Sequence, residues 1–313
     1  MKFWDVIKEV SAQPVRKEAG RLFVLSVAGE REAVAAARAE ALRGAGELEL
    51  AAAEPFFFSA SPPYSEEDER RLRYSDLLVS LPGGPAITEF RPADTLLLER
   101  PETLVPAVLA YRPELRVSLA RRLPGFRAAA ADVVVREVSR VNAECAVLSG
   151  LSRGIPWLLP LFPAVAGADI FLLTKNQVLM LFRLAAIYGE DLDLKSRARD
   201  VAAVIAGALG WRQLARVALG GLPFGIGLPA RAGMAYAATY AIGRSAQMVF
   251  DSGRRPSRAD MLRIYDDARR LGREAAGRLR PGSRRALPPP DPAGEEEASG
   301  AEARTEGDAD EGR

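Results

Sequence analysis

The chain has 313 residues, of which 48% are hydrophobic, and a formal net charge of +2. This length allows two modest domains with cores of their own, and the nearly balanced charge predicts no nucleic-acid partner. Histidine is absent, so the usual acid–base group and the commonest metal ligand are missing. Cys145 is the only cysteine, which excludes an internal disulfide and a thiolate metal cluster. We interpret it as a structural thiol on an apolar helix face.

Residues 1–20 are predicted to form an amphipathic helix that is interrupted at Pro14. Its apolar residues are broken by Asp5, Lys8 and Glu9, and no long apolar segment follows, so it does not match a signal peptide. We therefore expect the amino-terminal part to stay in the cytoplasm.

Residues 21–125 are predicted to form a small α/β domain. Short apolar runs alternate with charged, helix-forming segments, which is typical of a parallel sheet. The expected strands are Arg21–Val27, one or two within Glu47–Ala60, Ser75–Leu81 and Thr95–Leu98, and the expected helices are Glu30–Arg43 and Ser65–Arg73.

The first strand is followed by Gly29 and a helix, where a phosphate-binding loop would lie in a P-loop GTPase. That loop ends in Gly, Lys and Ser or Thr, but Val34, Ala35 and Ala36 hold these positions. We therefore interpret residues 21–125 as a degenerate P-loop GTPase-like domain without catalytic, cofactor-binding or metal-binding residues. An unrelated small α/β domain is the alternative.

Two other GTPase motifs are imperfect. Asp76 could begin the magnesium motif D-x-x-G, but Val79 replaces its glycine. The run Thr174–Gln177 is similar to the guanine-reading motif, but it has Gln where a carboxylate is needed and lies in the helical half. Neither motif predicts nucleotide binding.

Residues 126–280 are predicted to form an all-α domain, which makes the chain an α+β protein of two parts. Two charge-free stretches, Gly154–Ala168 and Val217–Ala230, interrupt its helices. The last helix is expected over Ser257–Leu279, with a capping box of Ser257 and Asp260. Residues 281–313 are rich in Pro and acidic residues, so we expect a disordered tail.

Two segments of the helical part carry a family resemblance. Leu173–Gly189, LTKNQVLMLFRLAAIYG, and Ala235–Gly253, AYAATYAIGRSAQMVFDSG, resemble the C-terminal domain of YcjF-like bacterial proteins. The resemblance covers roughly Val133–Gly253, and its other carriers are Asp169, Trp211–Arg216, Pro223 and Gly225. It implies a domain of unknown biochemical function that is associated with Era-like GTPases and is integral to the bacterial inner membrane.

The resemblance and the charge-free stretches together lead us to expect a transmembrane helix or another inner-membrane attachment. Each stretch is shorter than the roughly 20 apolar residues of a spanning helix, and the basic segment 175–216 would have to cross. A re-entrant hairpin, a peripheral surface and a soluble helical core are the alternatives. The membrane-contact candidates are Trp157, Leu158, Leu159, Leu161, Phe162, Leu222, Phe224 and Ile226.

Several other residues of the helical part have candidate roles. Small residues allow close approach of helices, so Gly233, Ala237 and Gly243 are predicted at helix contacts. Asp169 is interpreted as a helix N-cap or interfacial residue, or as an intramembrane acid. Anionic headgroup contacts are considered for Arg183, Arg216, Arg231 and Arg244, with solvated side chains as the alternative.

The leading hypothesis is a non-enzymatic, membrane-associated docking or assembly factor on the cytoplasmic side of, or integral to, the inner membrane. Its partners would be lipid and either a GTPase or a second copy. The alternatives are a soluble regulatory scaffold that binds through its acidic tail and an atypical nucleotide hydrolase.

Overall fold

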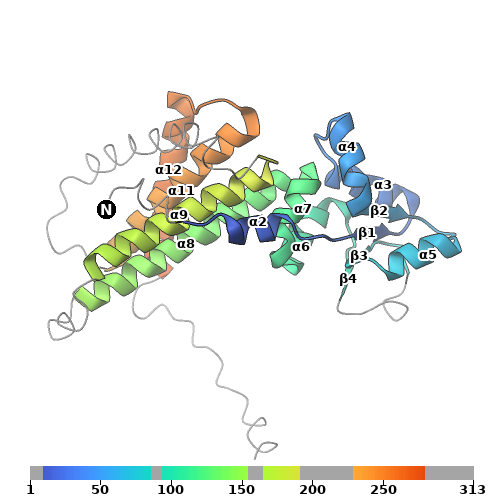
Figure 1. Ribbon diagram of the computed structural model, residues 1–313, viewed down its shortest axis with the longest axis horizontal. Helices are drawn as coiled ribbons and strands as arrows, with labels where there is room; N and C mark the ends of the chain where they lie inside the picture. Colours follow the sequence, from blue (N-terminus) through green and yellow to red (C-terminus); the bar gives the residue numbers. More distant parts are fainter. Residues whose placement is uncertain (1–9, 86–93, 154–164, 191–227, 279–313) are drawn as a thin grey trace, which may run out of the picture.

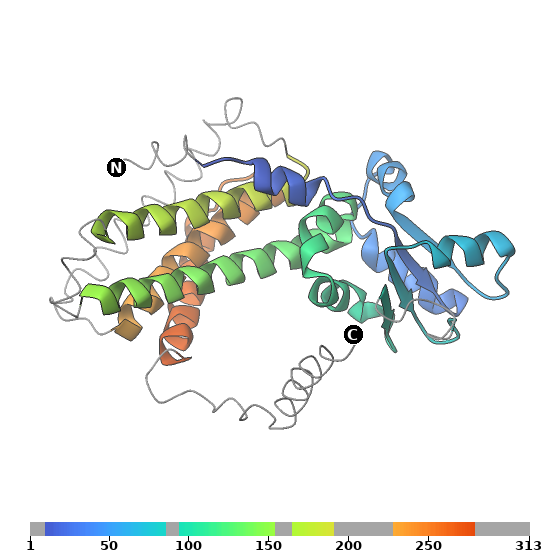
Figure 2. The ribbon, with the colours of Figure 1, turned by 60° about the horizontal axis from the view of Figure 1, so that its bottom comes forward.

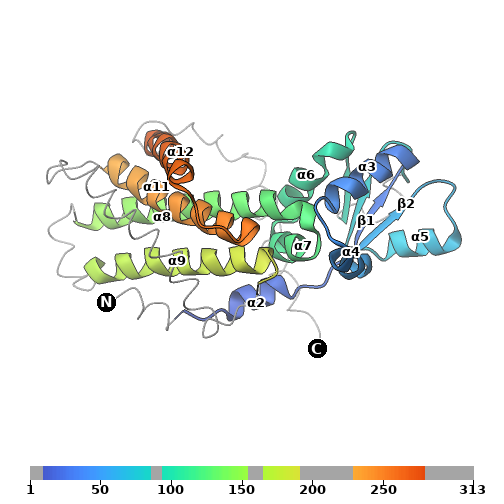
Figure 3. The same ribbon diagram turned by 90° about the horizontal axis from the view of Figure 1, so that it is seen from above.

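The computed structural model describes residues 10–85, 94–153, 165–190 and 228–278. A parallel sheet with its helices lies at one end, and four long helices lie at the other (Figure 1). The short helices α6 (Leu104–Tyr111) and α7 (Arg116–Arg122) lie between these two parts (Figure 3). The chain thus combines a small α/β part with a helical part, as its sequence predicts.

The sheet contains β1 (Leu25–Ala28), β2 (Phe57–Ala60), β3 (Leu77–Ser80) and β4 (Thr95–Leu97) in the order β2-β1-β3-β4. All neighbouring strands are parallel, and Leu25 aligns with both Phe57 and Leu77. Every residue of β1 and β3 is buried. Central strands of a parallel sheet are covered on both faces, which explains their nearly continuous apolar runs.

Three helices accompany the strands: α3 (Arg31–Ala41), α4 (Glu47–Ala53) and α5 (Glu66–Arg73). Of the one or two strands expected within Glu47–Ala60, one forms as β2, and α4 occupies the start of this range. Its Glu, Leu and Ala residues favour a helix, and the Glu49 carboxylate accepts a hydrogen bond of 3.1 Å from the Gly46 N–H. At α5, the Ser65 hydroxyl accepts the Asp68 N–H at 3.1 Å and caps the helix.

Helix α2 (Gln13–Ala19) precedes the sheet in sequence and packs against the helical part. Residues 10–12 are not helical, and Pro14 lies in the first turn of α2. Proline is tolerated there because its missing N–H would have no partner within the helix. Pro124 similarly occupies the first turn of the 3₁₀ helix η6 (Pro124–Phe126), which leads into the first long helix.

The four long helices are α8 (Arg127–Arg153), α9 (Val165–Ile187), α11 (Leu228–Ser252) and α12 (Arg258–Arg278). Helices α8 and α9 run side by side, and α11 packs against α8, α9 and α12 (Figure 2). Asp169 lies inside α9, so its assignment as an N-cap is wrong. The capping box of α12 is confirmed, because Ser257 and Asp260 exchange hydrogen bonds of 2.9 and 3.2 Å.

The expected transmembrane helix is not found. Within the described ranges, no helix combines the length and the apolar character that a membrane crossing requires. Charged residues are spread along the two most apolar long helices, as Lys175 and Arg183 are in α9 and Arg231 and Arg244 are in α11. The assignment of a transmembrane helix is therefore corrected for this part of the chain.

The larger of two apolar clusters runs from the sheet into the long helices, and a small separate cluster joins Ala28, Ala60, Leu72 and Leu78. The larger cluster includes Phe23 and Leu25 near the first strand and Leu184 and Ile264 in the helical part. Its two ends meet at several contacts, among them those of α3 with η6 and α6 and that of α4 with α7. A Cβ atom on Gly125 would lie 1.9 Å from the Glu40 carbonyl oxygen and 2.8 Å from that of Ala41. Only glycine therefore allows this contact between two backbones.

We predict that Gly125→Ala lowers the free energy of unfolding by about 2–3 kcal/mol, because the added methyl group forces the backbones of α3 and η6 apart. Urea unfolding followed by circular dichroism measures the change. The matched control is Gly277→Ala on α12, where a Cβ meets no atom within 4 Å. This control should be neutral or stabilising by up to about 1 kcal/mol. Equal stabilities of the two variants would contradict the assignment of Gly125.

Candidate functional site

The carboxyl edge of the sheet is the first candidate site. Open parallel sheets bind ligands beyond the carboxyl ends of their strands, where the strand order reverses. In this sheet the strand order reverses at β1, because β2 lies on one side of β1 and β3 on the other. Gly29 and Glu30 follow β1 and lead into α3, so the first turn of α3 faces the position that a phosphate would take.

The turn after β3 is hydrogen-bonded to the start of α3. The Glu30 N–H, at the start of α3, donates a hydrogen bond of 2.8 Å to the Pro82 carbonyl. The Leu81 N–H donates at 2.8 Å to the carbonyl of Ala28, the last residue of β1. The turn after β3 is thereby fastened over the start of α3, and one of the amides that could hold an anion already has a partner.

Close packing accounts for the glycine in this turn. A Cβ atom on Gly84 would lie 2.5 Å from the Ser80 hydroxyl oxygen and 2.7 Å from the Ala28 carbonyl oxygen. The Ser80 hydroxyl donates to the Pro85 carbonyl at 3.1 Å. The glycine-rich sequence Pro82–Pro85 therefore packs against the strand ends, where it contacts the Ser80 side chain and the backbone of Ala28 and Glu30.

Asp76, the candidate for a magnesium motif, lies at the other edge of the sheet. It precedes β3, and its carboxylate accepts a hydrogen bond of 2.7 Å from the Val24 N–H next to β1. Asp76 therefore joins the amino ends of two neighbouring strands. It cannot contact a ligand bound at their carboxyl ends.

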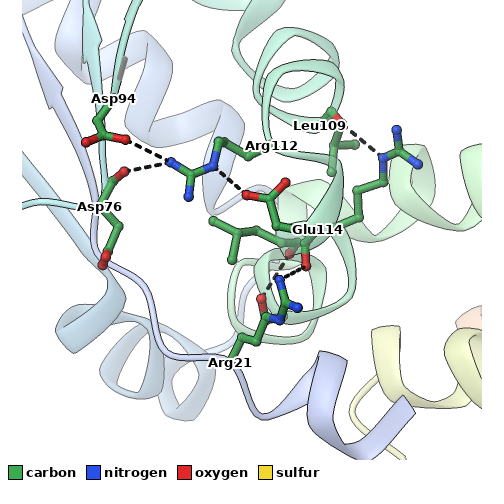
Figure 4. A network of polar contacts seen from close by, with 9 residues as sticks. Arg21, Asp76, Asp94, Leu109, Arg112 and Glu114 are labelled. Atoms are coloured by element: carbon green, nitrogen blue, oxygen red, sulfur yellow. Dashed lines mark hydrogen bonds and ion pairs between the residues drawn. The ribbon is translucent and has the colours of Figure 1, made fainter. Parts of the chain in front are cut away.

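Arg112 connects the same edge to the helical part (Figure 4). Its guanidinium donates at 3.0 Å to the Asp76 carbonyl and lies 3.4 Å from the Asp94 carboxylate. It also donates at 2.6 Å to the Glu114 carboxylate. Burial raises the pKa of Glu114, but the hydrogen bond and charge of Arg112 outweigh it, so this pKa is lowered. The carboxylate therefore stays ionised, and the network is a structural joint.

A buried polar cluster in the long helices is the second candidate site. Asn142 of α8 donates at 2.9 Å to the Thr239 hydroxyl of α11, and Gln177 of α9 donates to the same oxygen at 3.1 Å. Asn176 donates at 2.8 Å to the Asn142 side-chain oxygen. Asn142 and Thr239 are fully buried, and Gln177 is 7% exposed. One hydroxyl therefore links three helices.

The chemistry of this cluster is limited to hydrogen bonding. Amides and hydroxyls do not titrate near neutral pH, so Asn142, Gln177 and Thr239 supply no general acid or base. The Gln177 side-chain oxygen is buried without a partner. That oxygen costs free energy, whereas the paired amide N–H groups of Asn142 and Gln177 would lose the Thr239 hydroxyl in another register of α8, α9 and α11, which favours the observed one.

The structure places the predicted helix-packing residues as follows. Gly233 meets Gly272 where α11 crosses α12, and a Cβ on either glycine would lie within 2.8 Å of the other's carbonyl oxygen. Ala237 lies at the same crossing, whereas Gly243 faces Val135 and Met180. The eight membrane-contact candidates lie outside the described residues: Trp157, Leu158, Leu159, Leu161, Phe162, Leu222, Phe224 and Ile226.

Two of the arginines considered for lipid headgroups have protein partners. Arg183 is hydrogen-bonded to Glu18, and Arg244 lies 3.6 Å from the Asp132 carboxylate. Tyr188, at the end of the first resemblance segment, is largely buried, which raises its pKa to about 12. No group of three or more acidic or cysteine side chains in the described ranges is arranged to hold a metal ion.

Arg112, Asn142 and Thr239 were not predicted as site residues. Asn142 carries a weak signal, because a polar amide follows Val141 in an apolar helix segment. Arg112 carries none, since its partners Asp76 and Asp94 are distant in sequence. Comparison of the chain with protein-family models, curated proteins and solved structures found no match.

We predict that Thr239→Val lowers the free energy of unfolding by about 2–3 kcal/mol, because Gln177 loses its acceptor inside the core and Asn142 keeps only the longer bond of 3.4 Å to the Leu173 carbonyl. Thr239→Ser keeps the hydroxyl and removes one methyl group, so it should cost only about 1 kcal/mol. Thermal and urea unfolding measure both variants. A larger loss in the serine variant than in the valine variant would contradict a role for the hydroxyl.

Proposed function

We propose that the protein is a non-enzymatic docking or assembly factor, in which the α/β part presents a surface and does not hydrolyse nucleotide. The observation that carries this proposal is the hydrogen bond from the Glu30 N–H to the Pro82 carbonyl. It uses an amide that a phosphate would need, on a strand–helix turn that also lacks the lysine and hydroxyl of a P-loop. The degenerate GTPase-like origin of this part remains our interpretation.

Exposed apolar side chains favour a docking role for the α/β part. Leu22 and Tyr74 are 78% and 75% exposed, and each lies three residues before a strand, at the amino edge of the sheet. Leu48 on α4 is 88% exposed. Leu22 and Tyr74 precede neighbouring strands, and large exposed apolar groups that lie together are typical of surfaces that bind protein. The partner that we propose is a GTPase or a second copy of the chain.

The positions of the residues that carry the YcjF-like resemblance indicate what they do in the fold. Asn176 and Gln177 from its first segment and Thr239 from its second belong to one buried cluster. Gly243 is packed against Val135. These residues hold helices together, so the resemblance supports a shared helical fold more than a shared reaction. Association with a GTPase and with the inner membrane is carried over from it as a proposal.

We propose that any membrane association is peripheral, through the surface of the protein. Full-length protein should then sediment with membranes and be released by a carbonate wash at alkaline pH. Fractionation with salt and carbonate washes, followed by immunoblotting, measures this outcome. Resistance to carbonate would contradict peripheral attachment, and recovery without membranes would contradict the location and leave the docking role in place.

We predict that full-length protein shows no saturable binding of GTP or ATP with Mg²⁺ up to about 1 mM by isothermal titration calorimetry, a limit that corresponds to about −4 kcal/mol. The physical reason is that the Glu30 N–H at the start of α3 already donates to the Pro82 carbonyl. An intact P-loop GTPase measured under the same conditions is the positive control. Saturable binding of either nucleotide would contradict the proposal. Its loss on Gly29 and Glu30 replacement would assign the nucleotide to this turn.

A further inference from the structure

Helix α2 lies against the outside of the helical part, next to α9 and α7 (Figure 3). Val15 and Ala19 are four residues apart, so they share one face of the helix, and both are buried. Arg121 of α7 donates hydrogen bonds of 3.2 and 3.3 Å to the carbonyls of Ala186 and Glu190 at the end of α9. We call the surface of α7 and α9 beneath α2 the strap groove.

Helix α2 has little stability of its own. It contains seven residues, and its N-cap residue, Ala12, makes no side-chain cap. Pro14 lacks the N–H that could bond to such a cap. Helices shorter than about 12 residues are marginal in water without tertiary contacts. The helical state of α2 therefore depends on the strap groove.

A bidentate ion pair joins α2 to the strap groove. The Arg183 guanidinium of α9 donates two hydrogen bonds of 2.8 Å to the two carboxylate oxygens of Glu18. Both side chains are about one-third exposed or less. Paired, parallel hydrogen bonds between guanidinium and carboxylate are specific in geometry. Glu18 therefore sets where α2 rests on α9.

Arg183 also has a second carboxylate nearby. Glu137 of α8 contributes to its electrostatic surroundings and shares with Glu18 and Arg183 the lining of a cavity of about 240 Å³. Glu137 currently binds Arg116 at 2.6 Å. If Glu18 leaves, Arg183 is not left without an opposite charge, which lowers the cost of releasing α2.

The segment after α2 is suited to act as a hinge. Gly20 ends the helix, and Leu22 is 78% exposed. The chain is fixed again at Phe23, which is buried and packs against Phe56 with ring centroids 5.5 Å apart. Arg21 makes two long hydrogen bonds of 3.4 Å, from its guanidinium to the Glu114 carbonyl and from its backbone N–H to the Glu18 carbonyl. The hinge is thus confined to a few residues between two anchored elements.

We propose that α2 is a releasable strap and that the strap groove accepts α2 of a second copy, giving a strap-exchanged dimer. The second copy is the occupant that the structure supports, because its α2 carries the same buried face and the same carboxylate that the groove already binds. Exchange of an identical element is a low-cost route to a dimer, and a short hinge favours it. This inference concerns the helical part and holds whether or not the α/β part binds nucleotide.

The first experiment measures release of the strap in the full-length protein. Arg183→Glu places two carboxylates face to face, so trypsin should cut after Arg16 and Lys17 about tenfold faster, since cleavage follows the open population. Arg70→Glu on α5, which breaks an ion pair with Glu67 away from the groove, is the matched control and should not change this rate. An unchanged rate in a folded Arg183→Glu protein would overturn the releasable strap.

The second experiment mixes Glu18→Arg with Arg183→Glu and measures mass by light scattering after gel filtration. Exchange restores both ion pairs across the two chains, so the mixture should form a heterodimer that neither variant forms alone. The double variant Glu18→Arg/Arg183→Glu restores the pair within one chain and should match the unmodified protein. Faster cleavage in Arg183→Glu without a heterodimer in the mixture would overturn the second copy as occupant.

Hydrogen exchange on the unmodified protein tests the strap without any substitution. The amides of Arg16 and Gly20, which bond to the carbonyls of Ala12 and Arg16, should exchange at least about tenfold faster than those in the middle of α9. Equal exchange in α2 and α9 would show that the strap opens only with the whole fold and would overturn the proposal.

Discussion

The contact between the backbones of α3 and η6 is the constraint on which the rest of the structure depends. At this place the apolar core of the sheet continues into that of the long helices. Phe126, the residue after Gly125, is fully buried and begins the approach to α8. Because the two parts share one core, a change in the position of α3 is transmitted to α8, and neither part is a separate body on a flexible link.

This shared core also determines the state of the carboxyl edge of the sheet. Helix α3 is held at its far end by η6 and at its near end by the turn after β3. A helix that is held at both ends cannot easily move, and nucleotide-binding loops must move to enclose phosphate. The physical arrangement therefore favours a rigid surface for a partner, which is the basis of the proposed docking role.

The helical part uses polar groups to specify its packing. Thr239 joins Asn142 and Gln177 inside the core, while Arg183 and Glu18 join α2 from outside. The inner cluster is buried and resists separation, because each amide would lose its partner without gaining water. The outer pair is partly exposed, so solvent can replace it at lower cost. The helical part thus has a fixed centre and an attached element that can leave.

The sequence by itself determined much of the local structure. The alternating apolar and helix-forming segments predicted a parallel sheet, and Ser257 with Asp260 predicted the start of α12, because these signals lie within a few residues. Within Glu47–Ala60 the sequence left one or two strands open, since a short run of Leu and Ala suits either a strand or a helix, and the helix α4 was not predicted. The absence of the P-loop residues at Val34–Ala36 was also visible in the sequence alone.

Only the tertiary structure decided which distant residues meet. The contact of Gly125 with Glu40, the joint of Arg112 with Asp76 and the pair of Arg183 with Glu18 each join segments that no spacing rule connects. The same holds for the hydrogen bond from the Glu30 N–H to the Pro82 carbonyl, which uses an amide that a phosphate would need. Sequence patterns indicate the local secondary structure and the burial of a segment. Which residues far apart in the chain come into contact is determined by the packing of the whole core.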